Sequence, residues 1–277
     1  MSKKKILLRL LGFIIAYLFI VGIFQFLGGM LSGMSLTEPA IMTSKQLFAT
    51  VFGTFVGTVL LLYIFTKWID KIKFVEIGLQ TDAIIKDFFL GFLLGFLPIA
   101  LGFVILWQLG IIHHVQVRFN FSEILLSFII FLLVAFNEEA FMRGYILRNL
   151  MLAFNKYTAL ILSAVLFALL HIFNDNINFI GLTNIFLAGI LLGLPYIFTK
   201  NLWFPIGLHF AWNLTQTLFG FNVSGFNTYS VLSYQLSDKM SWLSGGAFGF
   251  EGSVLSLFFE VVLIVVVYFL FRKRHSS

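Results

Sequence analysis

The chain contains no cysteine, and this absence excludes several kinds of site. Without thiols there is no structural disulfide, no thiolate-bound metal and no cysteine nucleophile. Charged residues are scarce as well, at 11% of the 277 residues. Average soluble proteins carry about a quarter. The composition therefore excludes an ordinary soluble globular protein.

Long apolar runs take the place of the missing charge, and hydrophobic residues make up 60% of the chain. A transmembrane helix needs about 20 predominantly apolar residues. The first run is too long for the apolar part of a signal peptide, so we expect a retained helix. We predict an all-α polytopic membrane protein with about eight transmembrane helices. The predicted spans are 6–31, 48–67, 88–112, 122–150, 157–173, 180–199, 202–219 and 253–271.

The basic residues indicate the orientation of these spans. Two clusters, Lys3–Lys5 and Arg272–Arg274, adjoin the first and last spans, so they are topology signals and not nucleic-acid patches. Connections on the opposite side carry only Lys45, Arg118 and Lys239. We therefore expect a multi-pass protein of the cell membrane with both termini in the cytoplasm.

The organisation of the chain follows from the spans, because it shows no internal repeat and no linker between domains. Residues 1–119 hold the first three helices and, within 68–87, a cytoplasmic interfacial segment. Residues 120–220 hold the next four helices and form the expected core. Residues 221–277 hold the last helix and most of a Gly- and Ser-rich external loop, 220–252. Loops of that length are often functional.

Three charged residues lie inside the fourth predicted span: Glu138, Glu139 and Arg143. Each costs roughly 3 kcal/mol at membrane depth, and such residues normally face a protein interior or a wet cavity. On a helix Glu139 and Arg143 share a face because they are four residues apart. Glu138 points about 100° away. We predict that Arg143 holds Glu139 and that Glu138 stays available for chemistry.

Two further spans contribute polar residues. His171 ends the fifth span, and His209 and Asn213 lie one turn apart on one face of the seventh. Taken alone, His171 is compatible with an interfacial anchor, and the other pair with a hydrogen bond between helices. Glu260 in the last span has no partner in its own segment, and its role stays open.

Depth limits which of these residues can meet. Glu138 and His171 each lie roughly 25 Å along antiparallel helices from the connection that joins them. His209 lies only roughly 12 Å from the start of its helix. It can reach the other two only if the preceding connection is sunk into the protein, or if its helix is broken near Pro205.

The three patterns resemble a known family when they are taken in order. They are Glu138-Glu139-x-x-x-Arg143, Phe167-x-x-x-His171 and His209-x-x-x-Asn213. This set is similar to the motifs of the CAAX-protease and bacteriocin-processing family of intramembrane proteases, also called Abi-type or type II CAAX prenyl endopeptidases. About residues 120–220 carry the resemblance. The glycine-rich run 245–253 also looks like bacterial members.

The resemblance implies a helical core around a polar cavity and the hydrolysis of a peptide bond. In that reading Glu138 is the general base that activates a water molecule, assisted by His171. Asn213 and His209 stabilise the oxyanion of the tetrahedral intermediate.

For the other two residues of the first motif, Glu139 and Arg143, the resemblance implies that they hold the helix and tune the base. The implied partners are membrane lipid and a membrane-associated or lipidated peptide or protein. A bacterial source with a role in bacteriocin self-immunity or peptide maturation is compatible with these motifs.

The involvement of a metal stays open. Glu138, His171 and His209 could form an open catalytic zinc site. Their spacing is not the His-Glu-x-x-His arrangement that places two ligands on one helix face. The same residues also serve a metal-free mechanism in which glutamate activates water, and we favour that mechanism slightly.

Other functions remain as alternatives. A proton- or ion-coupled transporter could use Glu138, Glu139, His171 and Glu260 as a relay, although the chain lacks the repeats that many transporters show. A peptide-binding immunity or scaffold protein without catalysis is a third possibility. A serine or aspartyl intramembrane protease is disfavoured, because the chain has no Gly-x-Ser-Gly motif and its predicted spans contain no aspartate.

Overall fold

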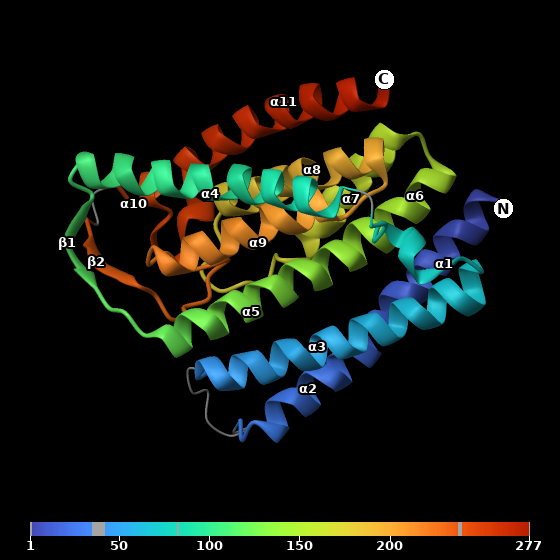
Figure 1. Cartoon of the computed structure of the whole chain (residues 1–277), viewed down its shortest axis with the longest axis horizontal. Coiled ribbons are helices and arrows are strands. Elements are labelled where there is room, and N and C mark those ends of the chain that lie inside the picture. Colours follow the sequence, from blue (N-terminus) through green and yellow to red (C-terminus); the bar gives the residue numbers. More distant parts are fainter. Residues whose placement is uncertain (1, 35–41, 82, 238–239, 277) are drawn as a thin grey trace.

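The chain forms a bundle of long helices with a small two-stranded sheet at one end (Figure 1). This computed structural model describes residues 2–34, 42–81, 83–237 and 240–276, so Lys239 of the topology argument lies outside the described residues. The N- and C-terminal ends lie at the end of the bundle opposite the sheet (Figure 1).

All eight predicted helical segments are present, and the all-α prediction is confirmed. Several are composite, because a turn of wider or different pitch interrupts the α-helix. In chain order the segments are α1 (Lys3–Ala16) with η1 (Tyr17–Val21) and α2 (Gly22–Leu31), α3 (Ser44–Ile64) with η2 (Phe65–Asp70), α4 (Ile84–Gln108), α5 (Phe121–Glu139) with η4 (Ala140–Leu147) and α6 (Arg148–Ala153), α7 (Lys156–Leu170), α8 (Phe179–Thr199), α9 (Trp203–Leu218) and α11 (Val254–Ser276).

Six of these segments in the described part of the chain are long and apolar enough to cross a membrane. The other two, α7 and α9, have only 15 and 16 residues. By length and composition, six of the about eight expected crossings therefore qualify as full spans in the described residues. The two short helices are those that carry the His171 and the His209–Asn213 patterns.

Two of the helices extend beyond the predicted spans and include an aspartate at one end. Asp70 closes the second span and Asp87 lies in the first turn of the third. Each pairs with an arginine from a terminal segment. Arg9 binds Asp70, and Arg274 Nη1 donates to Asp87 Oδ1 at 2.6 Å. These pairs join the terminal helices to the rest of the bundle.

The sheet was not predicted. β1 (Ile112–Val117) pairs antiparallel with β2 (Leu232–Leu236), and the register shifts between His113 and Gln116. His113 and His114 are exposed in β1. The sheet ties the connection before α5 to the loop that follows α9. Short strands so far apart in sequence leave no local signal for their pairing.

The connection between α8 and α9 is sunk, as the depth argument required. The segment around η3 (Phe74–Ile77) covers it: Leu202 N–H donates to the Gly78 carbonyl and Trp203 Nε1–H to the Gln80 carbonyl, both at 2.8 Å. Leu202 is fully buried. α9 is unbroken, with Pro205 in its first turn, where proline is tolerated. α9 therefore begins beneath this segment, and His209, six residues further along, is buried.

Candidate active site

The centre of the site lies where α5 passes into η4. η4 is π-helical, and such widened turns are frequent at functional sites. The predicted Glu139–Arg143 pair is present: Arg143 Nη1 donates to Glu139 Oε1 at 2.9 Å. Arg143 also donates from Nη2 to the Gly189 carbonyl at 3.2 Å, and its guanidinium lies 4.6 Å from the centre of the Phe167 ring. Contacts from three helices thus fix this buried cation.

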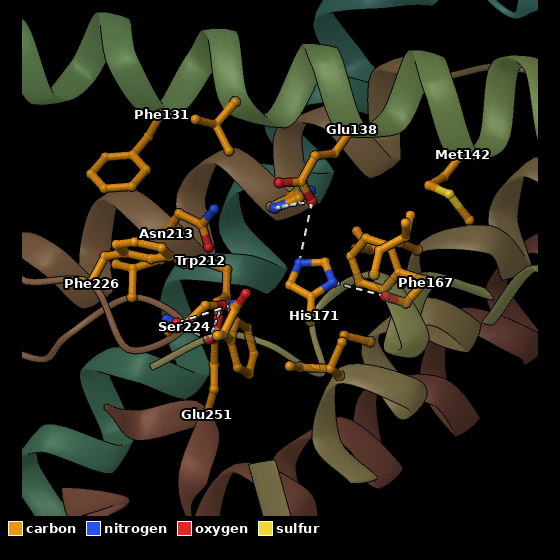
Figure 2. A pocket seen from close by; sticks show the side chains of 18 of the residues that line it. Phe131, Glu138, Met142, Phe167, His171, Trp212, Asn213, Ser224, Phe226 and Glu251 are labelled. Carbon is orange, nitrogen blue, oxygen red and sulfur yellow. Dashed lines mark hydrogen bonds and ion pairs between the residues drawn. The ribbon is translucent and has the colours of Figure 1, made fainter. Parts of the chain in front are cut away.

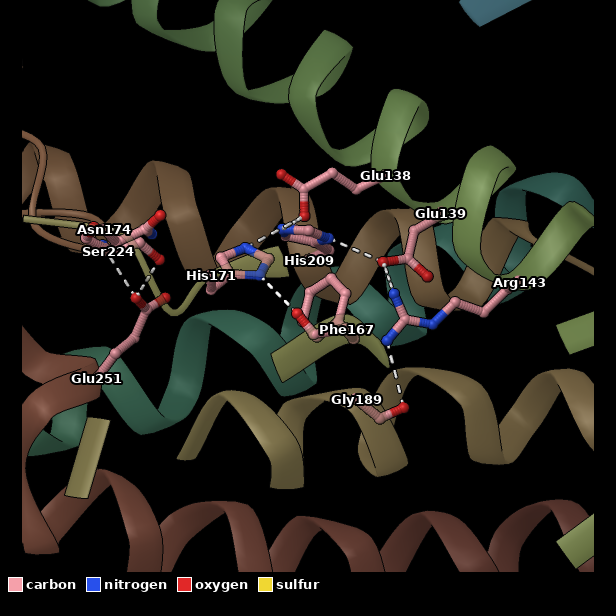
Figure 3. A network of polar contacts seen from close by, with 10 residues as sticks. All are labelled: Glu138, Glu139, Arg143, Phe167, His171, Asn174, Gly189, His209, Ser224 and Glu251. Carbon is pink, nitrogen blue, oxygen red and sulfur yellow. Dashed lines mark hydrogen bonds and ion pairs between the residues drawn. The ribbon is translucent and has the colours of Figure 1, made fainter. Parts of the chain in front are cut away.

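Glu139 has a second partner on another helix. Its Oε1 lies 2.8 Å from His209 Nδ1, so the carboxylate accepts that hydrogen bond as well (Figure 3). His171 Nδ1 faces the Phe167 carbonyl in the same way, also at 2.8 Å. Because each Nδ1 faces an acceptor oxygen, we assign the proton of each neutral ring to Nδ1. In both rings Nε2 is then directed elsewhere.

Both Nε2 atoms point to the same carboxylate. Glu138 Oε2 lies 3.9 Å from His171 Nε2 and 3.9 Å from His209 Nε2. The side chain of Glu138 is 33% exposed, whereas that of Glu139 is 0% exposed. The two adjacent carboxylates therefore have different surroundings: one holds an arginine and a histidine, and the other faces open space.

That space is a cavity of about 540 Å³, within the usual range for a ligand site. Asn213, one turn after His209 on α9, lines it together with Trp212 (Figure 2). Much of the remaining wall is apolar and includes Phe131 and Met142. The cavity can therefore accept an apolar chain while presenting a few polar groups to it.

All six residues singled out from the three motifs come together here. Glu138, His171, His209 and Asn213 line the cavity, and Glu139 and Arg143 stand behind them. Glu260, whose role was open, lines the same cavity from α11.

One cavity residue had been noted only as part of the glycine-rich run before the last helix. Glu251, in η7 (Phe250–Gly252), accepts two hydrogen bonds at Oε2 from Ser224, from N at 3.0 Å and from Oγ at 2.7 Å. Burial raises the pKa of Glu251, while the Ser224 hydrogen bonds and the nearby His171 and His209 act in the opposite direction. In the sequence, Glu251 is a single carboxylate within an apolar, glycine-rich run. That pattern does not predict which part of the protein the loop packs against.

The same residues are those that a catalytic zinc would need as ligands. Glu138, His171 and His209 face one another, but nowhere in the described ranges do three or more His, Cys, Asp or Glu side chains form a group that could hold a metal ion. The side chains as they stand give no ligand set from which a metal-dependent step can be derived.

Fold and site together define an integral membrane protein with a carboxylate–histidine centre inside its helical bundle. Residues 120–215 match the family model described as "Type II CAAX prenyl endopeptidase Rce1-like". The matched segment contains all three motifs, and it agrees with the resemblance predicted from them. The match supports an intramembrane endopeptidase. Searches of curated proteins and of solved structures find no match.

Proposed function

We propose that the protein is an intramembrane endopeptidase in which Glu138 activates a water molecule to hydrolyse a peptide bond. The observation that carries this proposal is the position of Glu138 Oε2, 3.9 Å from Nε2 of both His171 and His209. This separation is too long for a direct hydrogen bond, but one water molecule can bridge it. A general base must reach the proton that it abstracts directly or through one water.

In the proposed reaction Glu138 takes a proton from the water molecule while the water oxygen bonds to the carbonyl carbon of the substrate. His171 orients the water through Nε2. When the C–N bond breaks, the proton on Glu138 passes to the leaving amine, which restores the carboxylate. The products are a carboxylic acid and an amine, and no other reactant is needed.

Residues of α9 would stabilise the oxyanion. The Asn213 amide supplies one donor, and a His209 ring that also carries a proton on Nε2 supplies a second. Removing one donor of this kind typically slows an enzyme by about 100- to 1,000-fold. Glu139 and Arg143 act as positioning residues. Glu139 accepts a hydrogen bond from His209, Arg143 binds Glu139, and the cavity lining includes neither of them.

Zinc is kept as an alternative to the metal-free form of this proposal. Glu138, His171 and His209 would be its ligands, and it would supply an activated water. The experiment below separates the two forms.

The cavity supports a peptide or lipidated protein of the membrane as substrate. Its walls include the apolar side chains of Phe131, Phe141, Met142 and Phe226, which suit an apolar segment. We propose that the protein is located in the cell membrane of a bacterium, with both termini in the cytoplasm. We also propose that it acts in peptide maturation or bacteriocin self-immunity.

The test is cleavage of a fluorogenic peptide library by detergent-purified protein, with wild type, Glu138→Gln and Glu139→Gln compared with and without a zinc chelator. Cleavage that is lost in Glu138→Gln and indifferent to the chelator supports the metal-free form. Loss with the chelator that zinc restores would support the zinc form. No cleavage of peptides or of lipidated peptides by folded wild-type protein would contradict the proposal.

A further inference from the structure

The wall of the cavity opposite Glu138 holds a second polar group, which the mechanism does not use. It consists of Glu251, Glu260 and Asn184, and we call it the acidic lobe. Figure 2 shows Glu251 across the cavity from Glu138, with His171 between them. We propose that the acidic lobe binds a basic side chain of the substrate, so that the peptidase prefers lysine or arginine close to the scissile bond. This inference rests on the proposed function, because it concerns the substrate of the same cavity.

The acidic lobe contains buried hydrogen-bond acceptors that lack a donor among the described residues. Asn184 uses both hydrogens of its Nδ2, which donate to the carbonyls of Glu251 at 2.7 Å and Ser253 at 2.8 Å. These bonds fix the amide, so its Oδ1 can only accept, and it has no partner among the described residues. Glu260 Oε2 likewise has no partner in the part of the chain that the structure describes, although Ser256 donates to Oε1 at 3.3 Å.

Such groups need a donor, because a buried acceptor without a partner costs about 1–3 kcal/mol. Asn184 and Glu260 are only 1% and 2% exposed, and both line the cavity. A ligand that satisfies them must bring several N–H or O–H groups into a small volume.

The charge of the cavity lining also favours a cation. Among the described residues, the cavity lining contains three glutamates, Glu138, Glu251 and Glu260, and no lysine or arginine. Carboxylates on one buried wall repel one another when they are charged. A cation between them relieves this repulsion and receives charge-assisted hydrogen bonds, which are stronger than neutral ones.

The position of the acidic lobe indicates that the cation belongs to the substrate. Glu251, His171 and Glu138 line the same cavity, so the acidic lobe lies beside the reaction centre (Figure 2). A peptide held at Glu138 can therefore reach it with a long side chain. A guanidinium carries five N–H donors and an ammonium three, which suits an acceptor-only wall.

The test measures binding separately from cleavage. Pairs of short apolar peptides, identical except for a central arginine or its neutral isostere citrulline, are titrated into the Glu138→Gln protein by calorimetry. We expect the arginine peptides to bind about tenfold more tightly, which corresponds to ~1.4 kcal/mol. The ratio should fall to near one when Glu251→Gln is added. It should persist with Glu76→Gln, an exposed glutamate outside the cavity.

The outcomes separate the two proposals. Equal affinity for arginine and citrulline peptides in the Glu138→Gln background overturns the inference, whether or not the wild type cleaves peptides. A preference for arginine that disappears with Glu251→Gln upholds the acidic lobe even if no peptide is cleaved, and then only the proposed function fails. If the Glu251 variant does not fold, Glu260→Gln takes its place, and a ratio unchanged in that variant contradicts the assignment.

Discussion

At the scale of single residues, the contrast between Glu138 and Glu139 defines the site. They are neighbours in sequence, yet the helix turns their side chains to different surroundings. Glu139 is enclosed by Arg143 and His209, and all of its contacts keep other groups in place. Glu138 keeps one face open to the cavity. A motif with two adjacent carboxylates therefore combines a structural acid with a reactive one.

The structural half of this division predicts an effect on stability. Arg143→Met leaves the Glu139 carboxylate buried without its cation, which should cost about 3 kcal/mol. Adding Glu139→Gln removes the uncompensated charge and should recover part of that loss. Thermal unfolding in detergent measures both variants. A double variant no more stable than the single one would show that the ion pair is not what Arg143 contributes.

A second prediction at this scale concerns pH. The pKa of Glu251 is raised above its ordinary value of 4.5, so the folded chain binds this proton more tightly than the unfolded chain. Stability from this group is therefore complete below the ordinary pKa and is lost as pH rises through the folded pKa. Glu251→Gln has no such proton to lose.

The melting temperature of the wild type relative to Glu251→Gln should accordingly decrease as pH rises from about 4.5 towards neutrality. Both proteins contain the neighbouring His171, His209 and Glu260, so the difference reports on Glu251 together with its coupling to these groups. A difference that stays constant or grows with pH would be inconsistent with a pKa that burial raises.

At the scale of helices and connections, the sequence was informative wherever one segment determined its own structure. Apolar runs predicted each long helix to within a few residues, and the motifs on those helices predicted the polar wall of the cavity. The β1–β2 pairing and the place of Glu251 depend on chain segments that are distant in sequence, so neither was visible. Whether the α8–α9 connection is sunk was undecided for the same reason.

The segment that covers the α8–α9 connection gives the prediction at the scale of helices, because a substitution in it should move α9. Gly78 has φ +125°, and a Cβ there would lie 2.8 Å from Leu202 Cγ. Gly78→Ala should therefore destabilise the protein by about 1–3 kcal/mol and displace the start of α9, which lowers cleavage by moving His209. The matched control is Gly12→Ala in α1, where nothing lies within 4 Å of the added Cβ.

Thermal unfolding and initial rates of peptide cleavage measure the two glycine variants side by side. Alanine is the better helix former, so Gly12→Ala should be neutral or slightly stabilising. If the two variants behave alike, the segment around η3 does not set the depth of His209.

At the scale of the whole molecule, the N- and C-terminal ends lie opposite the β1–β2 sheet (Figure 1). The distribution of lysine and arginine predicts that the termini are cytoplasmic, so the sheet end is expected outside. The absence of cysteine makes this simple to test. In intact cells a membrane-impermeant maleimide should label Asn227→Cys but not Ser2→Cys. Labelling of Ser2→Cys alone would reverse the orientation, and the side from which a substrate enters would change with it.

The central claim is that Glu138 is the general base of a peptide hydrolysis. Its most direct test is the initial cleavage rate of the best library peptide, compared between wild type and Glu138→Gln of equal melting temperature. General-base catalysis typically contributes about 10²- to 10⁴-fold, so we expect a loss in that range with folding unchanged. A folded Glu138→Gln protein that cleaves within a few-fold of the wild-type rate would contradict the account.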